Sequence, residues 1–139
     1  MARAWLDGVD TIKPVKPDTI AKSLAIGNPA DGYYAYKVAK ESGGHGEHAT
    51  DEEIIEGMLL LARTEGIFTE TAGGVTVAVT KKLIETGVIP RGESVVISIT
   101  GNGLKTPDAL YERLEAHVKI KPSLSAFDRA LADLKNQTS

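Results

Sequence analysis

Apolar residues recur every three or four positions along most of this chain, which is the spacing of amphipathic helices. The spacing predicts helices over residues 2–7, 19–26, 30–42, 51–64, 75–86, 106–117 and 124–135. One run departs from it: Val95 to Ile99 is rich in β-branched residues and almost continuously apolar. Such a run favours a strand covered on both faces, as in a parallel sheet. The pattern therefore predicts an α/β fold with a short, mostly parallel sheet flanked by helices.

The helix predicted over residues 51–64 carries the clearest end signals. Thr50 and Glu53 have the spacing of a capping box, in which each side chain accepts a hydrogen bond from the other residue's amide. Gly66 follows the last turn and suits a left-handed C-terminal cap. The apolar positions expected to face the core are Ile54, Met58, Leu61 and Ala62.

Two glycine-containing turns are candidate ligand sites. Thr100-Gly101-Asn102-Gly103 follows the predicted strand, and ligands of open α/β sheets bind beyond the carboxyl ends of strands. Glu70-Thr71-Ala72-Gly73-Gly74 leads into the helix predicted over residues 75–86, whose first amides lack partners inside the helix. Glu70 either caps these amides or faces a ligand and assists proton transfer. For Thr100 the alternative is a buried strand followed by an ordinary turn.

Two further motifs have a structural and a functional interpretation. In Gly27-Asn28-Pro29 the residue before proline is held extended, so the motif either aims backbone donors at a ligand or forms a corner between helices. His45, Glu47 and His48 carry metal-ligating side chains, but Gly46 and the preceding glycines oppose a helix that would gather them. We therefore predict a solvated connection at His45–His48 and no metal site.

Composition narrows the classes of function. The chain has 139 residues, 42% hydrophobic and 25% charged, which suits one globular domain over residues 1–139. A net charge of -3 argues against a nucleic-acid or anionic-membrane surface, and no apolar run is long enough to cross a bilayer. The sequence contains no cysteine, so disulfides and thiolate chemistry are excluded. Its first residues lack the apolar core of a signal peptide, and we expect a cytoplasmic protein.

Three segments together closely resemble threonine synthase, a family of enzymes with the tryptophan-synthase-β architecture (fold type II) that use pyridoxal 5′-phosphate. They are residues 19–30, 64–76 and 99–105, and they occur in the family's order. The resemblance extends from about Ala2 to Pro122 and corresponds to the C-terminal part of the enzyme. It implies that the chain is part of the large domain of a three-layer sandwich. It also implies that the complete enzyme converts O-phospho-L-homoserine and water to L-threonine and phosphate.

The resemblance further implies roles for particular residues. Those that it places at the cofactor are Thr100, Gly101, Asn102, Glu70, Ala72 and Gly73. Those that it places near the substrate are Ile26, Gly27 and Asn28. The hydroxyl of Thr100 would face the pyridine nitrogen of the cofactor. Because a hydroxyl is far less acidic than a pyridinium, it would moderate the cofactor's capacity to withdraw electrons.

The chain departs from the family in what it does not contain. The lysine that forms the Schiff base and the loop that binds the cofactor phosphate lie upstream in the family, and Lys105 belongs to the third motif instead. Covalent catalysis through an imine needs that amine, so no catalytic residue is assigned here. We expect this chain alone neither to turn over substrate nor to retain pyridoxal phosphate. Its uncovered apolar surface should drive self-association or binding of the missing N-terminal half.

Two alternatives to a piece of threonine synthase remain open at this point. The chain could be a non-catalytic interaction or regulatory module derived from this fold. It could also belong to a related pyridoxal-phosphate lyase, such as a dehydratase or a cysteate synthase.

Overall fold

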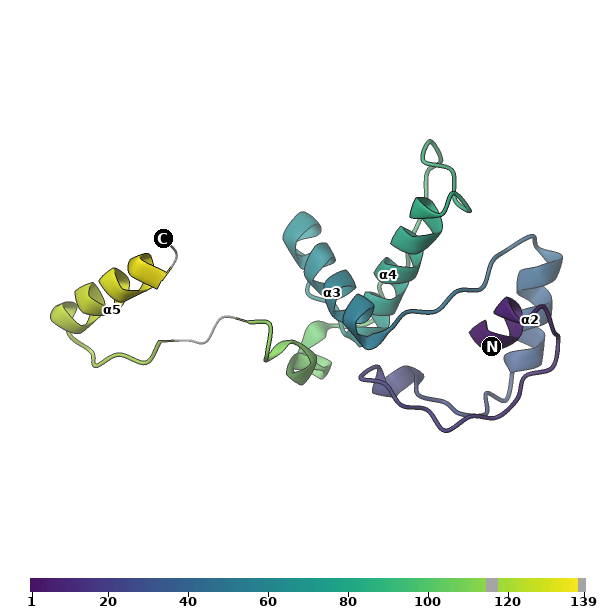
Figure 1. The fold of residues 1–139 in the computed structure, drawn as a ribbon, viewed down its shortest axis with the longest axis horizontal. Helices are drawn as coiled ribbons and strands as arrows, with labels where there is room; N and C mark the ends of the chain where they lie inside the picture. The colour runs from purple at the N-terminus through teal and green to yellow at the C-terminus, as the bar shows by residue number, and fades with distance from the viewer. Residues whose placement is uncertain (115–117, 138–139) are drawn as a thin grey trace.

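Two helices of 15 residues each, α3 (Asp51–Glu65) and α4 (Thr71–Glu85), form the centre of the molecule (Figure 1). The computed structural model describes residues 1–114 and 118–137. The two helices meet through glycines. A methyl group on Gly74 would lie 2.6 Å from the carbonyl oxygen of Ile54, and one on Gly57 would overlap the carbonyl oxygen of Gly74. Because glycine has no side chain, Gly57 and Gly74 allow α3 and α4 to approach closely.

The apolar core is built on α3. Ile54 and Met58 are buried there and pack against Ala21 and Leu110, which come from distant parts of the chain. Ala21 precedes the short 3₁₀ helix η1 (Lys22–Leu24), and Leu110 ends the 3₁₀ helix η3 (Pro107–Leu110). The inward positions Ile54, Met58 and Leu61 of the sequence pattern are thereby confirmed.

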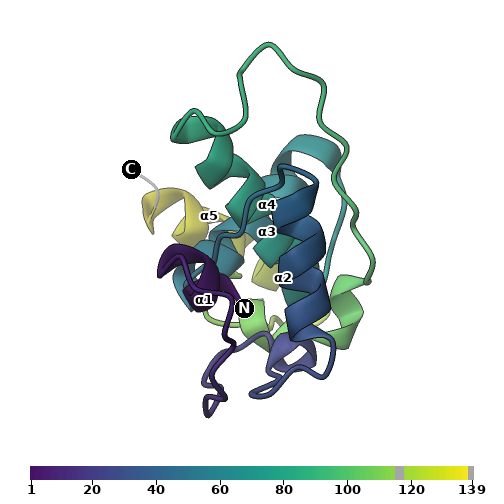
Figure 2. The ribbon, with the colours of Figure 1, turned by 90° about the vertical axis from the view of Figure 1, so that its right-hand side faces the viewer.

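The N-terminal helices lie beside each other at one side of the molecule. Figures 1 and 2 both show α1 (Ala2–Leu6) next to α2 (Gly32–Glu41). The rings of Trp5 and Tyr36 meet edge to face with centroids 5.5 Å apart, and Tyr36 is buried. The predicted helices over residues 2–7 and 30–42 are confirmed within one or two residues.

The predicted capping box at the start of α3 is present. The amide of Glu53 donates to Thr50 Oγ1 (3.2 Å), and the amide of Thr50 donates to Glu53 Oε2 (2.8 Å). Gly66 ends the helix with a φ of 67°. Lys82 of α4 places its Nζ 2.9 Å from Glu53 Oε1. The hydrogen bond from the Thr50 amide, followed by the contact with Lys82, lowers the pKa of Glu53.

This pKa shift predicts that the free energy of unfolding falls at acid pH, and we call this fall the acid limb. Because the pKa of Glu53 is lower in the folded state than its ordinary value of 4.5, its contribution is complete above that value and is lost as the pH falls through the folded-state pKa. We expect Glu53→Gln, which keeps the capping acceptor without the charge, to flatten that limb in urea titrations between neutral pH and about pH 3. The control is Glu65→Gln at the other end of α3. An unchanged acid limb in Glu53→Gln would contradict the assignment.

The predicted sheet is not formed among the described residues. Their only bridge is an isolated antiparallel pair between Thr69 and Asn102. The expected strand from Val95 to Ile99 has no ladder partner, and Val96 is 95% exposed. A parallel strand exists only beside neighbouring strands that satisfy its backbone groups, and the described part of this chain supplies none. The β-branched run is therefore uncovered here.

Three predicted helices differ from the structure. Residues 19–26 form only η1, because the carboxylate of Asp51 accepts hydrogen bonds from Thr19 Oγ1 (2.5 Å) and the Ile20 amide (3.2 Å) and holds them in a turn. Helix α4 begins at Thr71, four residues before the predicted start at Val75. The helix predicted over residues 106–117 is only η3 at its start, and residues 115–117 lie outside the described residues.

The last helix, α5 (Leu124–Gln137), agrees with the predicted one but lies apart from α3 and α4 (Figure 1). Its apolar stripe is largely exposed, for example at Leu124 and Phe127. Within residues 1–114 and 118–137, no helix is both long enough and apolar enough to span a membrane.

Candidate functional site

Two loops that are about thirty residues apart in sequence meet at the N-terminus of α4. We call this contact the two-loop junction; it joins residues 68–73 to residues 100–106. The amide of Glu70 donates to the carbonyl of Gly101 (3.1 Å), and the amide of Gly103 donates to the carbonyl of Phe68 (3.0 Å). Thr69 Oγ1 also donates to Gly101 (3.1 Å). The structure thus brings together the two turns that the sequence marks as candidate sites.

The carboxylate of Glu70 lies at the centre of the two-loop junction. Glu70 is only 5% exposed. Its Oε1 packs against the Cα of Gly101, so a methyl group added to Gly101 would overlap this oxygen. Its Oε2 lies 2.9 Å from Nζ of Lys105. Glu70 occupies the N-cap position of α4, but its carboxylate makes no capping hydrogen bond. Its side chain therefore ties α4 to the second loop rather than closing its own helix end.

Hydrogen-bond donors remain available at the first turn of α4. The hydroxyl of Thr71 is fully buried and has no hydrogen-bond partner among the described residues. Within the same part of the chain, the amides of Ala72 and Gly73 donate to no protein group, whereas the Thr71 amide donates to Thr106 Oγ1 (3.2 Å). An end of this kind, with unpaired donors and a positive potential, suits an electron-rich or anionic group.

Thr100 stands at the rim of the two-loop junction. Its side chain is exposed, and its hydroxyl forms no hydrogen bond with any residue that the structure describes. Two residues further on, Asn102 is the N-cap of the 3₁₀ helix η2 (Gly103–Lys105), and its Oδ1 accepts a hydrogen bond from the Leu104 amide (2.9 Å). The Thr100 hydroxyl is consequently free to accept from, or donate to, a molecule bound beside the turn.

The Gly27 motif lies elsewhere on the surface. Gly27 packs tightly against the backbone of Val15, whose amide donates to the Gly27 carbonyl (2.9 Å). Ile26 and Asn28 are exposed and line a surface hollow of about 660 Å³. No hydrogen bond or ion pair between described residues connects Ile26, Gly27 or Asn28 to the two-loop junction. Ile26 and Asn28 thus line a hollow of their own and have no direct polar contact with the two-loop junction among the described residues.

The histidine cluster does not form a metal site in the described residues. The ring of His45 packs edge to face on Trp5 with centroids 5.6 Å apart, while His48 Nδ1 lies 2.7 Å from Glu47 Oε1. The hydrogen bond from the His48 amide is the main cause that lowers the pKa of Glu47. Across the described ranges, no three metal-ligating side chains converge.

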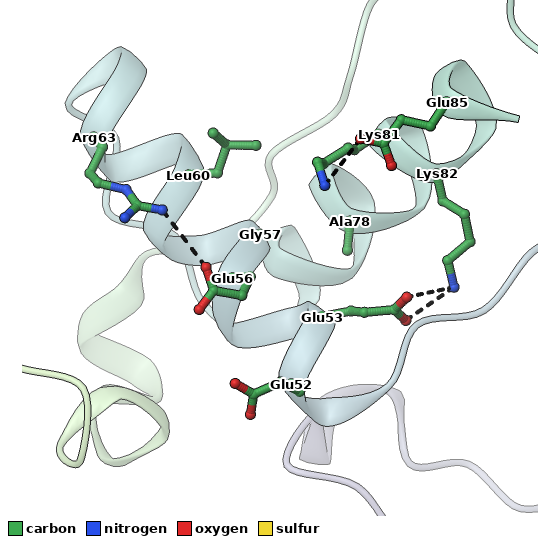
Figure 3. A pocket seen from close by; sticks show the side chains of 10 residues that line it. All are labelled: Glu52, Glu53, Glu56, Gly57, Leu60, Arg63, Ala78, Lys81, Lys82 and Glu85. Atoms are coloured by element: carbon green, nitrogen blue, oxygen red, sulfur yellow. Dashed lines mark hydrogen bonds and ion pairs between the residues drawn. The ribbon is translucent and has the colours of Figure 1, made fainter. Parts of the chain in front are cut away.

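A charged groove of about 380 Å³ runs between α3 and α4 (Figure 3). Its charged residues pair with one another: Lys82 with Glu53 across the helices, Lys81 with Glu85 along α4, and Arg63 with Glu56 along α3. Arg113 approaches the same face at Glu52 and Glu56. The charges of this groove are thus paired with one another on the surface of α3 and α4.

Sequence reasoning missed two residues of the two-loop junction. Lys105 is part of a recognised motif, but a 35-residue separation hides its ion pair with Glu70. Thr106 precedes η3 without capping it through its side chain, and its hydroxyl instead accepts a hydrogen bond from the Thr71 amide. Only contacts between distant segments reveal these two roles.

Comparison with known proteins gives the same assignment as the three motifs. Residues 1–101 match the family described as pyridoxal-phosphate dependent enzyme. The chain is 44% identical to the threonine synthase of Methanocaldococcus jannaschii over 125 residues, which are 90% of this chain and 31% of that protein. It is 41% identical to the enzyme of the same name from Halalkalibacterium halodurans over 78% of this chain and 30% of that protein.

A third threonine synthase, from Methanosarcina acetivorans, is 37% identical over 94% of this chain and 33% of its own length. The chain therefore spans about a third of the length of the curated relatives that it matches. Pyridoxal phosphate is the cofactor of the complete enzymes of this family. By the match over residues 1–101 and these identities, the chain belongs to the pyridoxal-phosphate dependent enzymes and is similar to threonine synthases.

Proposed function

We propose that this chain supplies part of the cofactor and substrate site of a threonine synthase, which converts O-phospho-L-homoserine and water to L-threonine and phosphate. The observation that carries the proposal is the two-loop junction, where the Glu70 and Thr100 motifs of the family come together. The remaining parts of the site, including the lysine that binds the cofactor and the loop for its phosphate, belong to the portion of the relatives outside this chain.

The residues at the two-loop junction fit a pyridine ring with polar substituents. The buried Thr71 hydroxyl without a partner in the described residues and the unpaired amides of Ala72 and Gly73 are donors for electron-rich groups. The exposed Thr100 hydroxyl suits the ring nitrogen. When bound, the cofactor supplies the electron-withdrawing ring that makes protons next to the amino group acidic.

The proposal assigns each residue a separate task. Thr100 binds the heterocyclic nitrogen through a neutral hydrogen bond, which holds the ring without protonating it. Gly101 lets the turn approach the Glu70 carboxylate, and Asn102 holds the turn through the Leu104 amide. Ile26, Gly27 and Asn28 take the substrate side, which requires the rest of the fold to bring the hollow at Ile26 towards the ring. The run from Val95 to Ile99 joins the sheet of that complete fold.

The test joins this chain to a separately made N-terminal segment that carries the lysine and the phosphate loop. We expect the complex to take up pyridoxal phosphate, to become yellow and to release phosphate from O-phospho-L-homoserine. Thr100→Ala should lower kcat/KM about tenfold, the cost of one hydrogen bond to a group that gains charge, while Thr100→Ser keeps most of the activity.

Three results would contradict this proposal. A stable complex without cofactor uptake, in which Thr100→Ala changes nothing, would identify a non-catalytic module. Cofactor uptake with release of a keto acid from an unphosphorylated hydroxy amino acid would identify a dehydratase instead. Formation of cysteate from a phosphorylated substrate and sulfite would identify a cysteate synthase.

A further inference from the structure

The ion pair between Glu70 and Lys105 is the only one at the two-loop junction among the described residues. Its two members have unlike surroundings. The Glu70 side chain is 7% exposed, whereas the Lys105 side chain is 62% exposed and reaches from the surface to the enclosed carboxylate. An ammonium group therefore neutralises a carboxylate that has little access to water.

We propose that Lys105 is a positioning residue of the cofactor site, whose ion pair with Glu70 holds the Thr100–Asn102 turn against the N-terminus of α4. The inference rests on the proposed function, since it names the group that keeps Thr100 in place beside the ring. Lys105 acts through Glu70 and has no contact with the reacting atoms.

The geometry explains how a lysine can hold a turn that lies three to five residues before it. One oxygen of the Glu70 carboxylate faces Gly101 and the other faces Lys105, so the carboxylate sits between two points of the same loop. The backbone of Glu70 is also bonded to Gly101. Asn102 bonds to the Leu104 amide and makes the intervening turn short and closed. Moving the carboxylate therefore moves the turn.

Removal of the ammonium would leave an enclosed carboxylate without its partner. Such a group gains free energy by turning towards water, and that rotation would withdraw the carboxylate from the Cα of Gly101. Since the lysine itself is largely exposed, the loss should be smaller than for a fully buried pair and larger than for a surface pair.

The experiment is a double-mutant cycle in the complex of this chain with the N-terminal segment. The variants are Lys105→Met, Lys105→Arg, Glu70→Gln and the double variant Glu70→Gln/Lys105→Met. Pyridoxal phosphate affinity is measured by titration, and hydrogen exchange of the Glu70 and Gly103 amides is measured without cofactor. We expect Lys105→Met to weaken affinity about tenfold and to accelerate both exchange rates, and Lys105→Arg to remain within about twofold of the wild type.

The Glu70→Gln background shows whether Lys105 affects cofactor binding through Glu70 or by contacting the cofactor directly. There, Lys105→Met should change affinity by less than about twofold. A full tenfold loss in that background would overturn the proposal, because it would mean that Lys105 acts on the ligand itself. Unchanged affinity and exchange in the single Lys105→Met variant would also overturn it.

Lys81→Met is the matched control, since Lys81 pairs with Glu85 (3.2 Å) near the other end of α4. This variant should leave cofactor affinity and amide exchange unaltered. If the wild-type complex takes up no pyridoxal phosphate, the proposed function fails. The exchange rates still decide the positioning role in that case. Faster exchange in Lys105→Met but not in Lys81→Met supports the role, and unchanged exchange in Lys105→Met overturns it.

Discussion

Replacing Gly57 by alanine is expected to lower the free energy of unfolding by about 3 kcal/mol, because the new methyl group overlaps the carbonyl oxygen of Gly74. Alanine is the better helix former, but that gain is only about 1 kcal/mol. The obstacle is backbone: the added Cβ would also lie 3.2 Å from the Ala78 amide nitrogen, so no side-chain rotation relieves the overlap. Helices α3 and α4 would have to separate, and the core at Met58 would open with them. Urea unfolding followed by far-ultraviolet circular dichroism measures the change.

Gly92→Ala is the control for this prediction. A methyl group at Gly92 meets nothing within 4 Å, so the same chemical change should alter stability by less than about 0.5 kcal/mol. Equal stability of the two variants would show that α3 and α4 do not meet through Gly57.

Gly101→Ala is expected to weaken pyridoxal phosphate binding about a hundredfold in the complex with the N-terminal segment, since overpacking a close contact costs up to about 3 kcal/mol and about 1.4 kcal/mol is tenfold in affinity. The added Cβ would overlap the Glu70 carboxylate and lie 2.6 Å from Glu70 Cγ. Glu70 is enclosed and paired with Lys105, so it cannot move aside without breaking that pair. The turn that carries Thr100 must shift instead. Titration of the cofactor, followed by its absorbance, measures the loss.

The double variant Gly101→Ala/Glu70→Ala distinguishes displacement of the turn from general damage. The overlap in Gly101→Ala should also lower the free energy of unfolding. Truncating Glu70 makes room for the new methyl group, so the double variant should regain that stability. Cofactor affinity should stay low, because the carboxylate that holds the turn is gone. Wild-type affinity in the single Gly101→Ala variant would refute the expected displacement.

Local signals in the sequence were sufficient for some elements. Helix α3 was predicted within one residue because Thr50, Glu53 and Gly66 are end signals that act over three or four positions. The predicted start of α4 at Val75 is four residues too late, since Gly73 and Gly74 resemble a loop in the sequence. The contact with α3 and the bond from the Thr71 amide to Thr106 make them helical. The sequence around Gly73 does not reveal contacts with α3 or Thr106, so the earlier helix start could not be predicted from it.

Predictions that needed a distant partner failed or stayed untested. Residues 19–26 had helical spacing, yet Asp51, more than thirty positions away, bonds to Thr19 and Ile20 and holds a turn. Both motifs of the two-loop junction could be found from the sequence, but their contact could not, because it depends on a buried carboxylate and a lysine 35 residues apart. The assignment of Thr100, Glu70 and the Gly27 motif to cofactor and substrate remains a prediction.

The uncovered run from Val95 to Ile99 has a consequence for handling the chain by itself. Five residues without proline or charge, four of them valine or isoleucine, form the kind of window that templates intermolecular cross-β aggregation. Arg91 and Glu93 precede the window, and no charged gatekeeper follows it before Lys105. Soluble yield should therefore depend on how soon after synthesis this segment is covered, which favours producing the chain together with the N-terminal segment of the proposed complex.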